Sequence, residues 1–292
     1  MYVSTSPIYR RGDSDNISSE GVLNSFLTSA ENTSVMSSRE NTLSYAKSLA
    51  CLPTLDVVSR RLYEVLDEKK ITFSRLLEIV QYDPALSSRI ISVANSAWHS
   101  RGVPVVSLRR AMTVLGLDEV KSVLLCSLFY DGVLKKLGLR KHEFLALWRH
   151  SLIAAFAANA LCGEEQKEAE KAFTAGLFHD IGKVPLQLLY HYDLENGKPG
   201  WDEVCADERQ KFETDHQEIG FYMATEWKLP EEYRQVIRLH HEETDGMRLA
   251  ELVKKANILM TCETEDAVLL EIRKTAQEKA ADIMNTFSAK KN

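Results

Sequence analysis

The sequence predicts an all-α protein, and three observations support this fold class. Apolar residues recur at helical spacing through most of the chain, N-terminal capping residues precede several of these runs, and no stretch alternates apolar and polar residues as a strand would. We expect a multi-helical body over residues 43–287. A polar N-terminal tail over residues 1–42 precedes it and has too few large apolar side chains to fold alone.

Residues 43–140 are expected to form an N-terminal helical lobe that faces a partner or regulates the rest. A helix follows the turn at Leu52-Pro53, Thr72 caps the next, and Asp83-Pro84 starts a third with a capping carboxylate and a first-turn proline. Asn95 lies inside this third helix and is expected to bond backbone groups between the two lobes. A further helix over residues 107–115 should stop at Gly116.

Residues 141–287 are expected to form the second lobe. It contains a long buried helix over residues 142–162 and a C-terminal helix over residues 265–287 with Val268 and Leu269 facing inward. The polar stretch between Lys183 and Asp215 is expected to be a surface connector with a short helix at 201–206, or alternatively a lid.

An apolar helical run from Phe173 to Phe178 ends in His179-Asp180, with Lys183 close behind. Burying such a pair without partners would cost about 2–7 kcal/mol for each neutral polar group, so a metal ion is the simplest occupant. His150 lies among small alanines on the 142–162 helix, which leaves room beside its ring. For each histidine, the alternative is a core imidazole that is hydrogen-bonded to backbone or carboxylate.

The composition excludes several classes of protein. The net charge of -6 argues against nonspecific nucleic-acid binding, which needs a basic surface. No apolar run reaches the roughly 18–20 residues that cross a bilayer, and the N-terminus has no secretory apolar segment, so we expect a cytoplasmic protein with no membrane contact. The five cysteines form no CxxC pair, which is typical of reduced thiols.

Several ordered motifs resemble the HDOD family, a bacterial group of HD-related output domains. The resemblance continues through His179-Asp180 to about Ala256, and it rests on Leu52-Pro53, Asp83–Ile90, Val93–Ala97 and Ala111–Gly116. It implies an all-helical signal-transduction module with a signalling protein partner. This fold is distantly related to the HD and HD-GYP metal-dependent phosphohydrolases, whereas the HDOD family itself is mostly non-catalytic.

By this resemblance, a set of residues corresponds to the metal ligands of the catalytic relatives: His150, His179, Asp180, His216, His240 and His241. One or two divalent ions are implied, and Fe, Mn and Zn all remain open because imidazole and carboxylate suit each of them. Lys183 would contact the phosphate of a small ligand. If the protein is an enzyme, Asp180 bridging two ions and Lys183 would be its catalytic residues.

The sequence departs from the catalytic relatives at two places. Asn257 stands where they carry a closing aspartate, and it is a weaker, neutral ligand. Met247-Arg248-Leu249 stands where the HD-GYP signature requires Gly-Tyr-Pro. Two hypotheses follow: a regulatory module with a metal-binding HD-like site and little or no catalysis, or a divalent-metal phosphohydrolase acting on a nucleotide or other phosphoester.

Overall fold

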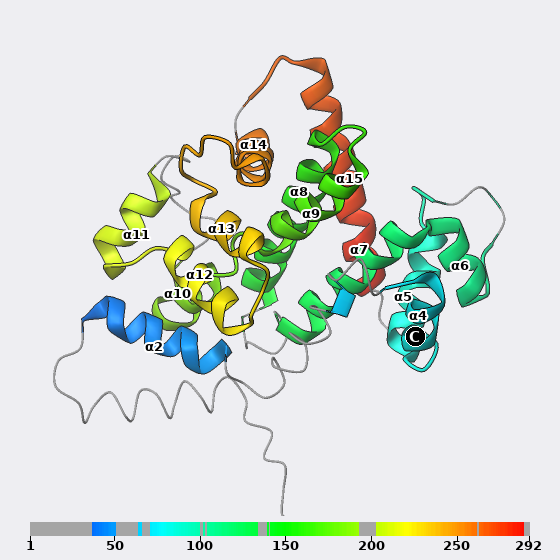
Figure 1. Cartoon of the computed structure of the whole chain (residues 1–292), viewed down its shortest axis with the longest axis horizontal. Helices are drawn as coiled ribbons and strands as arrows, with labels where there is room; N and C mark the ends of the chain where they lie inside the picture. The colour runs from blue at the N-terminus through cyan, green and yellow to red at the C-terminus, as the bar shows by residue number, and fades with distance from the viewer. Residues whose placement is uncertain are drawn as a thin grey trace, which may run out of the picture.

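The computed structural model describes residues 37–50, 64–65, 71–99, 102, 104–133, 139, 141–192, 203–261 and 263–288. Every regular element in these ranges is a helix and none is a strand, which confirms the all-α class (Figure 1). No helix in the described ranges is long and apolar enough to cross a bilayer. The helix predicted after Leu52-Pro53 lies mostly outside the described residues.

The N-terminal lobe consists of short helices that begin and end at the predicted signals. Thr72 and Asp83 accept hydrogen bonds from first-turn amides, and Gly116 ends a helix at φ +82°. Such caps satisfy amides that have no partner within the helix. The elements are α4 (Phe73–Val80), α5 (Pro84–Ala94), α6 (Leu108–Leu115), α7 (Leu117–Ser127) and the π-helical turn η1 (Leu128–Val133).

The second lobe is built around the pair α8 (Lys141–Leu161) and α9 (Gln166–Phe178), which pack against each other in the middle of the molecule (Figure 1). The other helices surround this pair: α10 (Lys183–Tyr190), α11 (Val204–Phe212), α12 (His216–Glu226), α13 (Glu231–Leu239), α14 (Arg248–Thr261) and α15 (Ala267–Ser288).

Helix α2 (Ser38–Ala50) begins inside the segment predicted as tail, and it packs on the second lobe. It lies against α10, α11 and α12 at the edge of the molecule (Figure 1). Arg39 pairs with Glu218 of α12, and the Thr42 hydroxyl lies 2.8 Å from the Tyr190 hydroxyl. Helix α2, which includes residues 43–50 expected in the first lobe, thus contacts the second.

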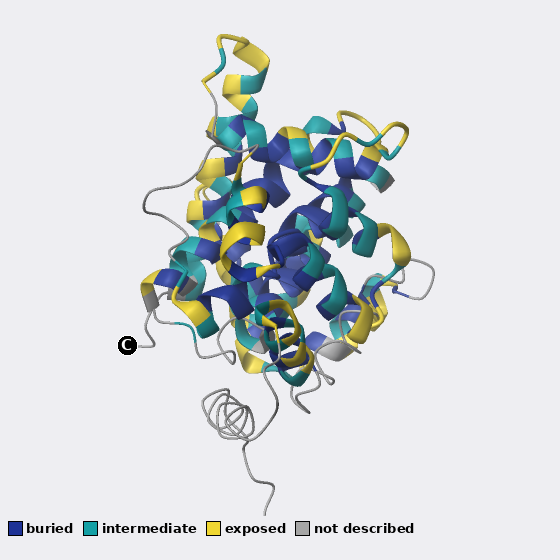
Figure 2. Ribbon diagram, turned by 90° about the vertical axis from the view of Figure 1, so that its left-hand side faces the viewer, coloured by how far each residue is buried: buried dark blue, intermediate teal, exposed yellow. Residues whose placement is uncertain are grey.

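Helix α15 connects the two lobes. It packs along α8 and also reaches α5, where the Arg89 guanidinium lies 4.2 Å from the centre of the Phe287 ring. Lys279 lies 4.8 Å from the ring centre of Trp98 in the same region. One continuous core of buried side chains passes from the first lobe into α8 and α9, and it occupies the centre of Figure 2. Cation–π contacts and shared core therefore hold the lobes together.

Three local predictions were wrong. Residues 183–190, expected to belong to a surface connector, instead form α10, which buries Val184, Pro185 and Leu186. Proline fits there because amides of the first turn need no helical partner. Asn95 ends α5 and bonds the backbone of Ile91 and Val105 within one lobe. The start of α15 projects from the body, which leaves Val268 69% exposed.

Candidate metal centre

The site forms where α9 ends and α10 begins. His179 and Asp180 occupy the turn between these helices, and both side chains are buried. Gly182 lets α12 approach this turn very closely, since a Cβ at this position would lie 1.9 Å from the His216 carbonyl oxygen. Only glycine permits that contact, which places His216 beside Asp180.

Four helices direct imidazoles at the Asp180 carboxylate. Its Oδ2 atom lies 3.0 Å from Nε2 of His150 on α8 and 3.3 Å from Nε2 of His179 at the end of α9. Its Oδ1 atom lies 3.4 Å from Nε2 of His216 at the start of α12 and 3.5 Å from Nε2 of His240 at the end of α13. The structure thus brings four of the sequence-predicted histidines to the two oxygens of one carboxylate.

The Nδ1 atoms, which point away from Asp180, fix the tautomers of His179 and His240. Nδ1 of His179 lies 2.7 Å from the Gly176 carbonyl oxygen, and Nδ1 of His240 lies 3.0 Å from that of Ile237. A carbonyl oxygen only accepts, so both Nδ1 atoms must donate, and each neutral ring presents an Nε2 lone pair to the site. Burial is the main cause that lowers the pKa of His240 to about 3, which keeps this ring neutral.

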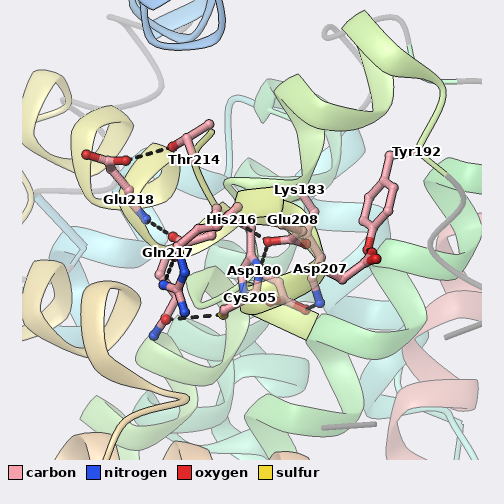
Figure 3. Close-up of polar contacts among 12 residues, drawn as sticks. Asp180, Lys183, Tyr192, Cys205, Asp207, Glu208, Thr214, His216, Gln217 and Glu218 are labelled. Carbon is pink, nitrogen blue, oxygen red and sulfur yellow. Dashed lines mark hydrogen bonds and ion pairs between the residues drawn. The ribbon is translucent and has the colours of Figure 1, made fainter. Parts of the chain in front are cut away.

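His216 is oriented by a fully buried carboxylate, Glu208 of α11. Glu208 Oε2 accepts hydrogen bonds from both Nδ1 and the backbone amide of His216, at 2.6 and 2.8 Å. Figure 3 shows Glu208 and His216 side by side near Asp180. A carboxylate behind an imidazole is the usual outer partner of a metal-binding histidine, because it fixes the ring and raises its basicity.

The facing nitrogens are spaced as ligands of a shared ion. Nε2 of His216 lies 3.2 Å from Nε2 of His240, and Nε2 of His150 lies 3.3 Å from Nε2 of His179. Two ligands that bind an ion at 2.0–2.1 Å with tetrahedral angles are about 3.3 Å apart. Nδ1 of His216 and of His240 each has an acceptor, so their Nε2 lone pairs face each other and repel unless a cation lies between them. Asp180 Oδ1 is buried and accepts no hydrogen bond within the described ranges, so the donor set fits a metal ion.

The two sides of Asp180 differ in charge. Lys183 Nζ lies 2.6 Å from Oδ2, whereas the Oδ1 side has only imidazoles within the distances above. Burial alone would raise the pKa of Asp180, but electrostatic interaction with His179 and Lys183 and hydrogen bonds from the neighbouring imidazoles outweigh it and hold that pKa well below the usual range. The carboxylate is therefore ionised, and on the Oδ2 side an ammonium already partly neutralises it.

The other two predicted metal ligands are His241 and Asn257. The His241 ring centre is 4.5 Å from that of His240 and 5.0 Å from that of His216, so His241 belongs to the same cluster. Burial is the main cause that lowers its pKa. Asn257 is buried on α14. Among the residues that the structure describes, three groups of side chains have the proximity that an ion requires: His150–His179–Asp180, Asp180–His216–His240 and Cys205–His216–His241.

Sequence reasoning did not single out Glu208 or Cys205, because it expected a surface connector with a short helix over residues 201–206 only, whereas α11 extends to Phe212. The only available signal was the run Val204–Phe212, in which Cys205, Glu208 and Phe212 recur at helical spacing and are buried. The polar residues between them hid this pattern.

A family model for the HDOD domain matches residues 52–243. Among solved structures, an HDOD domain protein of unknown function from Geobacter sulfurreducens is similar, with a TM-score of 0.67 and 22% identity over 86% of this chain and 99% of that one. A candidate phosphohydrolase from Shewanella amazonensis gives a TM-score of 0.61 and 19% identity over 83% and 97% of the two chains. At these identities the likeness shows the fold alone.

Two curated proteins match at lower coverage. An uncharacterized protein of Treponema pallidum is 22% identical over 65% of this chain, and a Ribonuclease Y of Onion yellows phytoplasma is 32% identical over 44%. The chain spans 37% and 20% of the lengths of these relatives.

Proposed function

Because the chain belongs to the HDOD domain family, we propose that it is a signal-transduction or regulatory module whose HD-like site binds divalent metal and has little or no catalytic activity. The observation that carries this proposal is the set of Nε2 atoms around Asp180, with spacings of 3.2 and 3.3 Å between facing nitrogens. A bound ion would supply Lewis-acid chemistry or a rigid ligand-sensing centre.

The first ion is proposed to bind on the Oδ1 side, held by Asp180, His216 and His240. A second ion, held by His150, His179 and Asp180, would require Lys183 to leave Oδ2. Lys183 could then contact a phosphate group of a small ligand. The ion is proposed to be Fe, Mn or Zn, with His241 and Asn257 near it as further ligands.

Weak or absent catalysis is proposed from two features of the chain. Asn257 replaces the closing aspartate of the catalytic relatives, and Met247-Arg248-Leu249 replaces the Gly-Tyr-Pro of the HD-GYP enzymes. Both changes remove groups on which those enzymes depend, by the resemblance described above.

The N-terminal lobe, residues 43–140, is proposed to face a signalling protein partner, and the HD-like lobe, residues 141–287, to carry the ion. The side chains of Tyr82 and Val106 support the first assignment, because they are 83% and 86% exposed on the lobe without the histidine cluster. We further propose a cytoplasmic protein.

Elemental analysis of protein purified without chelator tests the metal site. Wild-type protein should contain close to stoichiometric metal, and His216→Ala, which removes a ligand of the first ion, should contain less. His142→Ala is the matched control, because this histidine lies on α8 with a side chain that is 76% exposed. Substoichiometric metal that does not fall further in His216→Ala would contradict the proposed site.

The second candidate function is a divalent-metal phosphohydrolase. It is favoured by the two oxygens of Asp180, each of which lies close to its own pair of imidazoles, as in a carboxylate that bridges two ions. The metal-loaded protein should be assayed with cyclic dinucleotides, nucleotides and a generic phosphodiester. Turnover that Asp180→Ala abolishes would establish this function in place of the non-enzymatic one.

A further inference from the structure

Cys205 is a buried thiol beside the candidate metal centre. It lies near the start of α11, and its Sγ atom and a nitrogen from each of His216 and His241 all lie within 4.8 Å of one another. Its thiol donates to Gln217 Oε1 at 3.3 Å, a contact drawn in Figure 3. No position of the HD ligand pattern in this chain corresponds to Cys205.

The helix that carries Cys205 is already part of the site. Cys205 and Glu208 are three residues apart on α11, so they share one face, and Glu208 holds Nδ1 of His216. Glu208 Oε1 is buried and accepts no hydrogen bond from the residues that the structure describes. Arg209 pairs with Asp215, the residue that caps α12, and Cys205 bonds Gln217. Helix α11 therefore contacts the residues on both sides of His216.

Two ligand sets therefore meet at His216, which is the one residue that they share. Asp180, His216 and His240 offer oxygen and two nitrogens, whereas Cys205, His216 and His241 offer sulfur and two nitrogens. Glu208 engages Nδ1 of His216, so only Nε2 of this ring is left to bind an ion. The two sets are therefore alternatives for one ion. Thiolate favours zinc and similar softer ions, and carboxylate suits manganese and harder ions.

We propose that Cys205 is a metal ligand for softer ions: Zn²⁺, Co²⁺ or Fe²⁺ binds through Cys205 Sγ, His216 and His241, and Mn²⁺ binds through Asp180, His216 and His240. Binding through sulfur forms a metal–sulfur bond and releases the thiol proton to solvent. The inference rests on the proposed function, because it needs an ion at this site. It refines that function: the position at Asp180, His216 and His240 is kept for Mn²⁺, and the softer ions move to the position at Cys205.

Absorption spectroscopy of the full chain loaded with Co²⁺ tests this, since thiolate bound to Co²⁺ gives a charge-transfer band in the near ultraviolet. The band should be present in wild-type protein, and it should be lost in Cys205→Ser and in His241→Ala. It should persist in Cys162→Ser, a buried cysteine on another helix end, and in a variant whose other four cysteines are all serine. Circular dichroism and melting confirm that each variant is folded, and Cys205→Ala replaces Cys205→Ser if the serine variant is not.

Affinity measurements give a second readout. Cys205→Ser should weaken Zn²⁺ binding by about tenfold or more, equivalent to about 1.4 kcal/mol, and leave Mn²⁺ binding nearly unchanged. If Co²⁺ binds in stoichiometric amount without the band, the role of Cys205 is refuted and the proposed metal site stands. If no ion binds to the folded wild-type protein, the proposed function fails as well.

Discussion

At the residue scale, three histidines of the site each use one ring nitrogen for a hydrogen bond within the protein and direct the other toward Asp180. The outer nitrogens of His179, His216 and His240 bind a carbonyl, a carboxylate and a carbonyl, and the inner nitrogens meet at Asp180. Such an arrangement preorganises the lone pairs before an ion arrives, so less ordering remains to be done on binding.

A substitution at Glu208 tests whether the hydrogen bond to Nδ1 of His216 affects metal binding. Glu208→Gln should weaken metal binding about 10–100-fold, the usual range for an outer partner of a ligating histidine, because the amide no longer supplies a negative charge to Nδ1 of His216. Titration calorimetry with Zn²⁺ or Mn²⁺ measures the change. Asp207→Asn is the matched control on the same helix, because Asp207 contacts Tyr192 and Lys211 instead. Equal affinities for both variants would show that Glu208 does not tune His216.

Glu170 predicts a pH dependence away from the metal site. Burial, together with a hydrogen bond to Asp118, raises the pKa of Glu170 to about 7, despite the Lys121 ammonium 3.3 Å away. Between pH 4.5 and 7 the folded state then binds more protons than the unfolded state, so stability falls as the pH rises through this window. Glu170→Gln should remove this loss, which is at most about 1.4 kcal/mol per pH unit.

Urea unfolding of chelated protein at pH 5 and at pH 8 measures the effect. The stability of Glu170→Gln relative to wild type should be greater at pH 8 than at pH 5. Glu78→Gln, an exposed carboxyl on α4, should show no such change. A wild-type stability that rises from pH 5 to pH 7 in parallel with that of Glu170→Gln would contradict the assignment.

At the element scale, the position of α12 is set by a close backbone contact. Gly182, at the start of α10, faces the His216 carbonyl oxygen and the Gly220 amide, and Gly220 in turn lies against Ile237 of α13. These two glycines let three helices approach closely enough to bring His216 and His240 together.

Gly182→Ala should therefore shift α12 and weaken metal binding as well as stability. The added Cβ would lie 1.9 Å from the His216 oxygen and 2.6 Å from the Gly220 nitrogen, and overpacking of this kind costs about 1–3 kcal/mol or more. Gly163→Ala is the control, because its φ of +65° makes alanine strained without any neighbour within 4 Å. It should lose about 1–2 kcal/mol of stability and keep its metal affinity. Unchanged metal affinity in Gly182→Ala would show that this contact does not position His216.

At the scale of the whole molecule, the two lobes share one core and one long C-terminal helix. The Arg89–Phe287 and Lys279–Trp98 contacts join α15 to the first lobe, and α15 also packs along α8, which carries His150. We therefore expect the lobes to unfold in one transition, so an event at the metal site changes the stability of both.

Metal removal should lower the melting temperature of the whole chain. An ion present at about 100 times its Kd stabilises the folded state by about 2.7 kcal/mol, which for a chain of this size is about 5–10 °C. Thermal unfolding of chelated and Mn²⁺-loaded protein measures this shift, and Asp180→Asn should show little of it. Two separate transitions, of which metal moves only one, would show that the lobes unfold independently.

Residues close in sequence determined much of the fold. The caps at Thr72 and Asp83, the stop at Gly116 and the long helix through His150 are local features, because they depend on residues a few positions apart. The same holds for the neighbours His179 and Asp180 at the end of an apolar helix. The all-α class and the HDOD family were predicted correctly from such features.

Only the tertiary structure decided which groups meet. Helix α10 was missed because the polar stretch between Lys183 and Asp215 resembled a connector, and the short helix expected at 201–206 did not identify Glu208 or Cys205 as site residues. Their contacts with His216 join residues from different helices, and no spacing along the chain encodes which ring nitrogen each partner binds. That choice depends on how α8, α9, α11, α12 and α13 pack around Asp180, because helix packing brings distant residues within bonding distance of one carboxylate.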